Sequence, residues 1–239
     1  SAWEYNPPPA TIVGTLRKQL QVSGAVAELV ARLGFIDPEE ARRFLNPRLS
    51  EIACPFDIPN LREAATRICQ AIDQGQRIVI CGDYDVDGVT STTLLVDILQ
   101  KFETYPKFIV PLRLDEGYGL TRRAAERAMD CGEAADLFIA LDCGTNSVEE
   151  AQYILSLGCD LVVVDHHQSK HPLPEKVLLV NPHVHVDERN EARRFCTVGL
   201  VFKLAHGILK LRREQKDQRA FDITLSEYLD LVSMGTIAD

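Results

Sequence analysis

"RIVICGDYDVDGVTSTTLL", residues 77–95, decides how this 239-residue chain folds. The stretch begins with a short apolar run, RIVIC, and continues with three aspartates at alternate positions, Asp83, Asp85 and Asp87, followed directly by Gly88. A short run rich in Val and Ile is typical of a β-strand that is covered on both faces. Three carboxylates this close repel one another. The turn after the strand therefore binds a cation, acts on a phosphoryl group or is an exposed acidic turn.

Four more apolar runs follow, at residues 107–112, 137–142, 161–165 and 177–181, and they alternate with stretches of helical pattern. Alternation of strands and helices predicts parallel strands that are joined by right-handed crossovers. We therefore expect an α/β fold with a doubly wound, mostly parallel five-stranded sheet.

The beginning of the chain has a different pattern, in which apolar residues recur at helical spacing. One helix start is marked by the segment DPEE at 37–40, with an acid at the N-cap and proline in the first turn. We expect an N-terminal helical leader at residues 1–75 and an α/β domain at residues 76–239. Because the chain stops at Asp239 without a helix stop signal, we also expect that further C-terminal domains are absent from it.

Composition narrows the class of protein. Hydrophobic residues make up 46% of the chain and charged residues 26%, as in ordinary globular proteins. We expect no membrane association, because no apolar run approaches the roughly 20 residues that span a bilayer. Seven cysteines without a CxxC pair predict reduced thiols in the cytoplasm. The net charge of −9 argues against a uniformly basic nucleic-acid binder. It does not exclude nucleic acid, because bound metal reverses the local sign.

Acids, imidazoles and an amide follow four of the predicted strands, and the carboxyl ends of parallel strands meet at one edge of a sheet, where ligands bind. The pair His166–His167 is the most informative, because neighbouring residues in extended chain point to opposite sides. One imidazole is then expected to bind a metal and the other to face a phosphate, and carboxylates with imidazole suit Mn²⁺ or Mg²⁺ better than Zn²⁺. The polar residues at the strand ends are Asp83, Asp85, Asp87, Asp142, Asp165, His166, His167 and Asn181.

Two other interpretations of the acidic turn differ in strength. A calcium EF-hand loop beginning at Asp83 needs Glu at its twelfth position, which is Leu94, and a helix before it, where a strand is predicted. That interpretation is rejected. A haloacid-dehalogenase-like phosphatase, with Asp85 as nucleophile and Asp87 as acid and base, is an open alternative.

Four segments together resemble the motifs of the DHH phosphoesterase superfamily: GDYDVDGVTST, LDCGTNS, VVVDHH and GTIAD. Flanking phrases such as FLNPRL, EGYGL, NPH and VGLVFKL are similar to those of the RecJ-like single-strand-specific exonucleases. The resemblance implies two Mn²⁺ or Mg²⁺ ions and 5′-to-3′ hydrolysis of single-stranded DNA in repair and recombination, with other repair proteins as partners. Alternatives are a DHH hydrolase of oligoribonucleotides, cyclic dinucleotides or pyrophosphate, and a non-catalytic scaffold. RecJ-like proteins continue into further domains, so this chain alone is expected to degrade DNA weakly or not at all.

The resemblance also implies roles for individual residues. Many superfamily members have histidine where this chain has Cys81, which we expect to pack at the strand end. Arg189, Arg193 and Arg194 have two interpretations, a track for the DNA backbone or a solvated charged loop, and the solvated loop is favoured. The implied catalytic residues are Asp142, His167 and Asp165. The implied metal ligands are Asp85 for one cation, Asp87, His166 and Asp239 for the other, Asp142 for both, and Asp83 as support or outer ligand. The implied substrate contacts are His167, Arg113, Tyr118 and Gly88.

Overall fold

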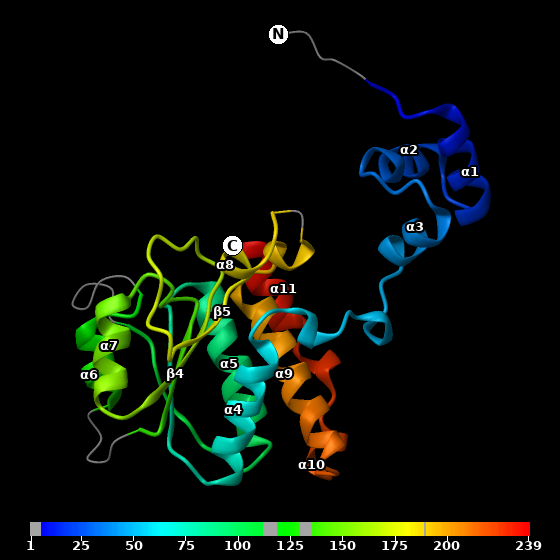
Figure 1. Ribbon diagram of the computed structural model, residues 1–239. Coiled ribbons are helices and arrows are strands. Elements are labelled where there is room, and N and C mark those ends of the chain that lie inside the picture. The colour runs from blue at the N-terminus through cyan, green and yellow to red at the C-terminus, as the bar shows by residue number, and fades with distance from the viewer. Residues whose placement is uncertain (1–5, 112–118, 130–134, 189) are drawn as a thin grey trace. The chain divides into compact units, whose positions relative to one another are not determined.

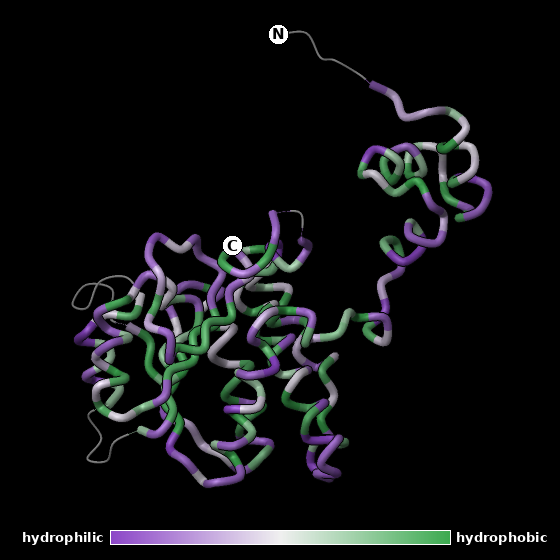
Figure 2. Tube along the Cα trace, in the orientation of Figure 1, coloured by the Kyte–Doolittle hydropathy of each residue, from purple (hydrophilic) through white to green (hydrophobic). Residues whose placement is uncertain are grey.

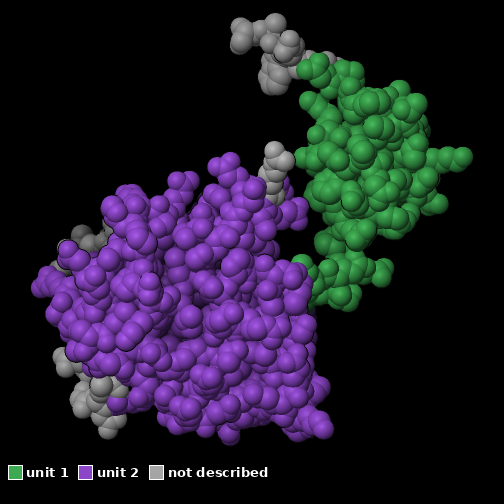
Figure 3. Space-filling view, in the orientation of Figure 1, with its two compact units in different colours: residues 1–53 green, residues 54–239 purple. Residues whose placement is uncertain are grey.

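The computed structural model describes residues 6–111, 119–129, 135–188 and 190–239 (Figure 1). The chain forms two compact units, residues 1–53 and residues 54–239, which Figure 3 colours separately. This division differs from the boundary expected after residue 75. The last helix of the predicted leader, α4 (Leu61–Asp73), packs along α9 (Thr197–Glu214) and buries six of its side chains. It therefore belongs with the sheet.

The first unit is a small helical cluster whose helix starts follow local rules. The Ser23 side chain accepts a hydrogen bond from the backbone N–H of Val26, and Asp37 accepts one from Glu40 over 3.0 Å. Such caps satisfy backbone donors that have no partner inside the helix. The core of the unit consists of Leu16, Ala27, Val30, Ala31 and Ala41. Its elements are α1 (Ala10–Leu20), α2 (Gly24–Arg32), α3 (Pro38–Leu45) and the short η1 (Leu49–Glu51).

The second unit is built on a sheet of five parallel strands in the order β2-β1-β3-β4-β5. The predicted α/β fold and its five strands are confirmed. From β1 the chain moves outward to β2 and then returns to the other side of β1 with β3. The carboxyl ends of β1 and β3 therefore form a topological switch point, where ligands bind in open parallel sheets. The strands are β1 (Ile78–Gly82), β2 (Lys107–Ile109), β3 (Leu137–Leu141), β4 (Asp160–Val164) and β5 (Leu178–Val180).

Helices cover both faces of this sheet: α4, α5 and α9 lie on one side, and α6 and α7 lie on the other (Figure 1). Side chains alternate between the faces, so that Val79, Cys81, Phe138 and Ala140 join the core beneath α6 and α7. The tube in Figure 2 is accordingly apolar along the strands. The remaining elements are η2 (Pro55–Asp57), α5 (Val86–Gln100), α6 (Arg122–Met129), α7 (Val148–Ser156), α8 (Pro182–His185), η3 (Glu191–Arg194), α10 (Arg219–Asp222), η4 (Leu225–Tyr228) and α11 (Leu229–Ala238).

Among the residues that the structure describes, none of the helices has both the length and the apolar character needed to cross a bilayer.

Candidate metal centre

The turn between β1 and α5 is short, and two glycines make it possible. A Cβ atom on Gly82 would lie 1.9 Å from the hydroxyl oxygen of Thr92, and one on Gly88 would lie 2.4 Å from the carbonyl oxygen of Asp83. The first turn of α5 therefore packs directly against the backbone that leaves β1. The N–H of Gly88 donates to Oδ1 of Asp85 over 2.9 Å, so the structure gives this glycine a packing role, and its substrate contact stays a prediction.

The three aspartates of this turn lie in different environments. Asp85 is exposed and forms the N-cap of α5. Asp83 is buried, and its Oδ1 accepts the N–H of Tyr84 over 2.7 Å. Burial raises the pKa of Asp83, and the negative charge of Asp85 adds to this effect. Asp87 is only 1% exposed and points to the other side, toward the beginning of α9.

Both carboxylate oxygens of Asp87 accept backbone hydrogen bonds from the first turn of α9. Oδ2 accepts the N–H of Thr197 over 2.6 Å, and Oδ1 accepts the N–H of Val198 over 2.7 Å. These bonds satisfy backbone donors at the start of α9 that have no partner inside the helix, and they hold the carboxylate of Asp87 in one orientation. Gly235 of α11 completes the packing, because a Cβ atom there would lie 3.1 Å from Oδ1 of Asp87.

Asp142 follows β3 in the left-handed backbone region, with φ of +62°. Its Oδ1 lies 3.4 Å from Nε2 of His166 and accepts a hydrogen bond from the hydroxyl of Thr197 over 2.8 Å. Burial, with a smaller contribution from the negative charge of Asp87, raises the pKa of Asp142 to about 7, although the hydrogen bonds from His166 and Thr197 act in the opposite direction. A buried carboxylate among other carboxylates needs a positive partner to stay ionised.

His166 lies at the centre of these acids. Its Nε2 is 3.9 Å from Oδ2 of Asp87 and 3.7 Å from Oδ1 of Asp239, which ends α11. Hydrogen bonding to Asp142, together with the charge of Asp239, raises the pKa of His166. Ligand atoms of Asp87, His166 and Asp239 all lie within 4.8 Å of one another, and so do those of Asp142, His166 and His167. Three carboxylates around one imidazole nitrogen form a donor set that suits a divalent cation.

Asp165 organises both histidines after β4. Its Oδ1 accepts the backbone N–H of His166 over 2.8 Å, the N–H of His167 over 3.2 Å and a bond from Nδ1 of His167 over 2.7 Å. Burial alone would raise the pKa of Asp165, but the bonds from His167 and Thr145 hold it at about 2. The same pair raises the pKa of His167 to about 9. Asp165 therefore stays ionised and fixes the His167 ring.

The two imidazole rings lie side by side and do not point to opposite sides of the chain, as expected from extended backbone. Their centroids are 4.7 Å apart, with 56° between the ring planes. The reason is local, because β4 has ended at Val164 and both backbone N–H groups turn toward one oxygen of Asp165. The His167 side chain is nevertheless 55% exposed and the His166 side chain 18%, so only His167 faces outward to a large extent.

Three buried polar residues support the centre, and none of them was assigned a role from the sequence. Thr197 holds Asp142, as described above. The N–H of Thr145 donates to Oδ2 of Asp165 over 3.0 Å. Nδ2 of Asn181 donates to the hydroxyl of Thr145 over 2.9 Å and to the carbonyl of His167 over 2.8 Å. Thr145 lies in the LDCGTNS motif and Asn181 ends a predicted strand, so the sequence did indicate that these two residues lie near the site. No such indication existed for Thr197.

The structure thus brings most of the predicted site residues together at one edge of the sheet. Cys81 is fully buried in the core beneath α6 and α7, as expected from its place in the strand. Arg113, Tyr118 and Arg189 lie outside the described residues. The residues that meet at this edge are Asp83, Asp85, Asp87, Asp142, Asp165, His166, His167 and Asp239.

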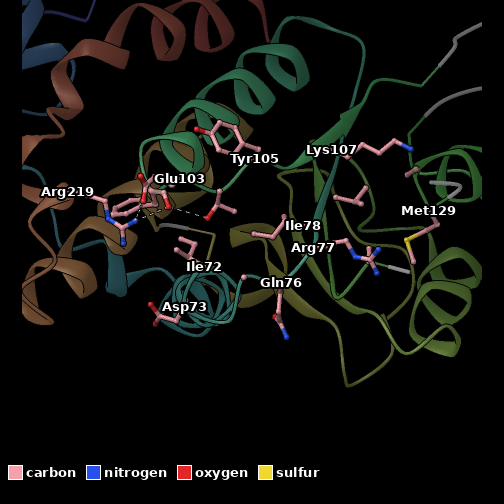
Figure 4. Close-up of a pocket in the computed structure, with 16 residues that line it drawn as sticks. Ile72, Asp73, Gln76, Arg77, Ile78, Glu103, Tyr105, Lys107, Met129 and Arg219 are labelled. Carbon is pink, nitrogen blue, oxygen red and sulfur yellow. Dashed lines mark hydrogen bonds and ion pairs between the residues drawn. The ribbon is translucent and has the colours of Figure 1, made fainter. Parts of the chain in front are cut away.

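A pocket of about 700 Å³ lies at the opposite edge of the sheet, at the amino ends of β1 and β2 (Figure 4). Arg77, Lys107 and Arg219 contribute its positive charges, and Asp73 and Glu103 contribute negative ones. Arg219 is already paired with Asp217 over 2.9 Å. Catalysis needs several ionisable groups that converge on one point. We therefore place the centre at the carboxyl edge, where the acids and imidazoles converge.

Comparisons with known proteins agree with this placement. Residues 77–236 match the family model described as "DHH family, N-terminal domain". The chain is 37% identical to the single-stranded-DNA-specific exonuclease RecJ of Bacillus subtilis over 237 residues, covering 99% of this chain and 28% of that protein.

Solved structures show the same likeness. The crystal structure of RecJ in complex with Mn²⁺ from Thermus thermophilus superposes with a TM-score of 0.76 at 28% identity, over 98% of this chain and 31% of that one. RecJ in complex with Mg²⁺ from the same organism gives a TM-score of 0.65 at 25% identity, over 98% of this chain and 28% of that one. The chain spans about a third or less of these relatives. With the four motifs brought to one edge of a parallel sheet, and with a family match over most of its length, the chain belongs to the DHH family.

Proposed function

We propose that this chain carries the metal-dependent centre of a nuclease that removes nucleotides from the 5′ end of single-stranded DNA. One observation carries the proposal: the carboxylates of Asp87, Asp142 and Asp239 surround Nε2 of His166 at the carboxyl edge of the sheet. The RecJ relatives that match nearly the whole chain are single-stranded-DNA-specific exonucleases, which supports the substrate and the reaction.

The donor set fits Mn²⁺ or Mg²⁺, because carboxylate oxygens with one or two imidazoles suit these cations. Asp87, His166 and Asp239 would hold one ion, and the short distances among their ligand atoms support this grouping. Asp85 would hold the other ion with Asp83 nearby, and Asp142 would contribute to both. When bound, two such divalent ions would lower the pKa of a water molecule and neutralise the charge of the phosphodiester.

Residues of the chain itself prepare the centre for this chemistry. Thr197 holds the Asp142 carboxylate in one orientation, and the first turn of α9 does the same for Asp87. Asp165 accepts from Nδ1 of His167, so Nε2 of that ring becomes a second donor when the ring is protonated. With a pKa of about 9, His167 is positively charged at neutral pH. It would contact a phosphate oxygen, which the large exposure of its side chain supports.

The wider biology is part of the same proposal. The protein would act in DNA repair and recombination in the cytoplasm, with other repair proteins as partners. A hydrolase of oligoribonucleotides, cyclic dinucleotides or pyrophosphate is not favoured, because the RecJ relative described above is a single-stranded-DNA-specific exonuclease. A haloacid-dehalogenase-like phosphatase is not favoured either, since the family match covers the same acidic turn.

The test uses the full natural protein with Mn²⁺ and single strands that carry a label at the 5′ or the 3′ end, beside duplex DNA, short RNA and cyclic dinucleotides. We expect early release of the 5′ label as a mononucleotide, and no release by Asp142→Asn. Asp160→Asn, at the opposite end of β4, is the control and should be fully active. Turnover of the small substrates alone would refute the proposal.

A further inference from the structure

Arg193 lies in η3, shortly before α9, and its hydrogen bonds within the described part of the chain go to neutral groups. Its Nη2 is 3.1 Å from Nδ1 of His183, and its Nη1 donates to the carbonyl of Val186 over 3.3 Å. Among the described residues, no carboxylate forms an ion pair with Arg193. By contrast, Arg67 pairs with an aspartate over 2.6 Å and so does Arg212. Within the described part of the chain, no ion-paired carboxylate therefore offsets the positive charge of Arg193.

His183 serves as the support of this guanidinium. An arginine side chain has donors only, so Nδ1 of His183 accepts and the proton of the neutral ring lies on Nε2. Burial lowers the pKa of His183, and the positive charges of Arg193 and His166 lower it further. Together the two side chains present N–H donors and no acceptor, which is the arrangement that an anion with several oxygens requires.

The pair is tied to the centre on both sides. Oδ1 of Asn181 accepts the N–H of His183 over 2.8 Å, while Nδ2 of the same amide donates to the carbonyl of His167. Arg193 itself lies in η3, which precedes α9 directly, and Thr197 at the start of α9 holds Asp142. The buried amide of Asn181, 1% exposed, therefore fixes the pair relative to the catalytic edge.

We propose that Arg193, oriented by His183, binds a backbone phosphate of the single strand next to the scissile one. The inference rests on the proposed function, because it assigns a second phosphate to the same substrate. For Arg193 it favours contact with the DNA backbone over the solvated loop, and it adds the partner that orients the side chain and the position of the phosphate. A guanidinium can bind two oxygens of one phosphate, so this contact would fix the register of the strand and not only attract it.

The experiment measures kcat/KM of the full natural protein with Mn²⁺ on oligothymidylates that carry one neutral methylphosphonate at each linkage beyond the scissile one. For the wild type we expect a single linkage at which the neutral group lowers kcat/KM about tenfold, the usual effect of one charged hydrogen bond. Arg193→Gln should lower kcat/KM similarly on the unmodified strand. In this variant the methylphosphonate at that linkage should no longer lower kcat/KM. The slope of log(kcat/KM) against log[salt], called the salt slope below, should be smaller in magnitude by about 0.7.

Two variants keep the result interpretable. Arg194→Gln removes the same charge from the neighbouring exposed residue and should retain the sensitive linkage. Arg193→Lys keeps the charge but loses the forked geometry of the guanidinium. Its salt slope should therefore equal that of the wild type, while the methylphosphonate should lower kcat/KM less than it does in the wild type. If methylphosphonates at each linkage affect kcat/KM equally in the wild type and in Arg193→Gln, and thermal unfolding is unchanged, the inference is wrong. The proposed nuclease function would still stand in that case. A wild type that hydrolyses no DNA would overturn the proposed function and this inference together.

Discussion

The hydroxyl of Thr197 tests how the chain prepares its metal ligands. It donates to Oδ1 of Asp142 over 2.8 Å, and both residues are at most 1% exposed. Thr197→Val preserves the shape of the side chain and removes this donor. The backbone N–H that holds Asp87 stays in place. The substitution therefore changes one hydrogen bond to one ligand.

The expected magnitude follows from that bond. A hydrogen bond to a charged group contributes about 1.5–3 kcal/mol, which corresponds to roughly 10- to 100-fold in a binding constant. The bond from Thr197 lowers the pKa of Asp142, so its loss moves that pKa upward from about 7. The Mn²⁺ affinity of Thr197→Val at pH 7 should therefore be lower than that of the wild type by this factor of roughly 10 to 100. At pH 9 the loss should be smaller, because the carboxylate is then ionised in either protein.

Isothermal titration of Mn²⁺ into the full natural protein at the two pH values gives the comparison. Thr92→Val is the matched control, because the buried Thr92 hydroxyl has no hydrogen-bond partner in the described part of the chain. The control should bind Mn²⁺ as the wild type does, with equal or slightly higher thermal stability. Equal Mn²⁺ affinities for Thr197→Val and Thr92→Val at pH 7 would refute the reasoning.

Three further outcomes are expected. Gly88→Ala should lower the free energy of unfolding by about 1–3 kcal/mol, because the new Cβ would lie 2.4 Å from a backbone oxygen. Gly14→Ala, in a helix with open space around it, should raise that free energy by up to about 1 kcal/mol. Chemical denaturation measures both values, and equal effects would contradict the tight packing at Gly88. Asp165→Asn should lower the pKa of His167 from about 9 toward about 6.5, followed by NMR of the ring protons; an unchanged value would show that another group sets it. The pKa of Asp142 is higher in the folded protein than in the unfolded chain, so the metal-free fold binds more protons than the unfolded chain between about pH 4 and 7. The free energy of unfolding should therefore fall as the pH rises through that window, whereas the affinity for Mn²⁺ should rise. Thermal unfolding at several pH values, with and without Mn²⁺, measures both effects.

The strands and the edge that carries the acids were predictable from the sequence. Runs such as residues 137–141 are apolar on both faces, and the chain topology then brings Asp142 and Asp165 to one edge. Contacts between distant segments were not predictable. Asp87 accepts its hydrogen bonds from Thr197 and Val198, which follow it by 110 and 111 residues, and nothing in the local pattern indicates that pairing.

Local backbone geometry was the second feature that the sequence did not predict. The alternation rule for extended chain fails at His166 and His167 because Asp165 gathers both of their N–H groups on one oxygen. Asp142 has a positive φ, which aspartate adopts more often than most residues, but most aspartates have a negative φ, so the residue type alone did not predict it. The domain boundary was displaced for a similar reason, since the packing of α4 against α9 depends on residues far apart in sequence.

The most direct test of the metal centre is anomalous diffraction from crystals of the protein grown with Mn²⁺. We expect two peaks roughly 3.5–4 Å apart, both within bonding distance of the Asp142 carboxylate, with His166 and Asp239 at one of them. Peaks that lie away from Asp142, or no peak at the carboxyl edge of β1 and β3 at saturating Mn²⁺, would contradict the account.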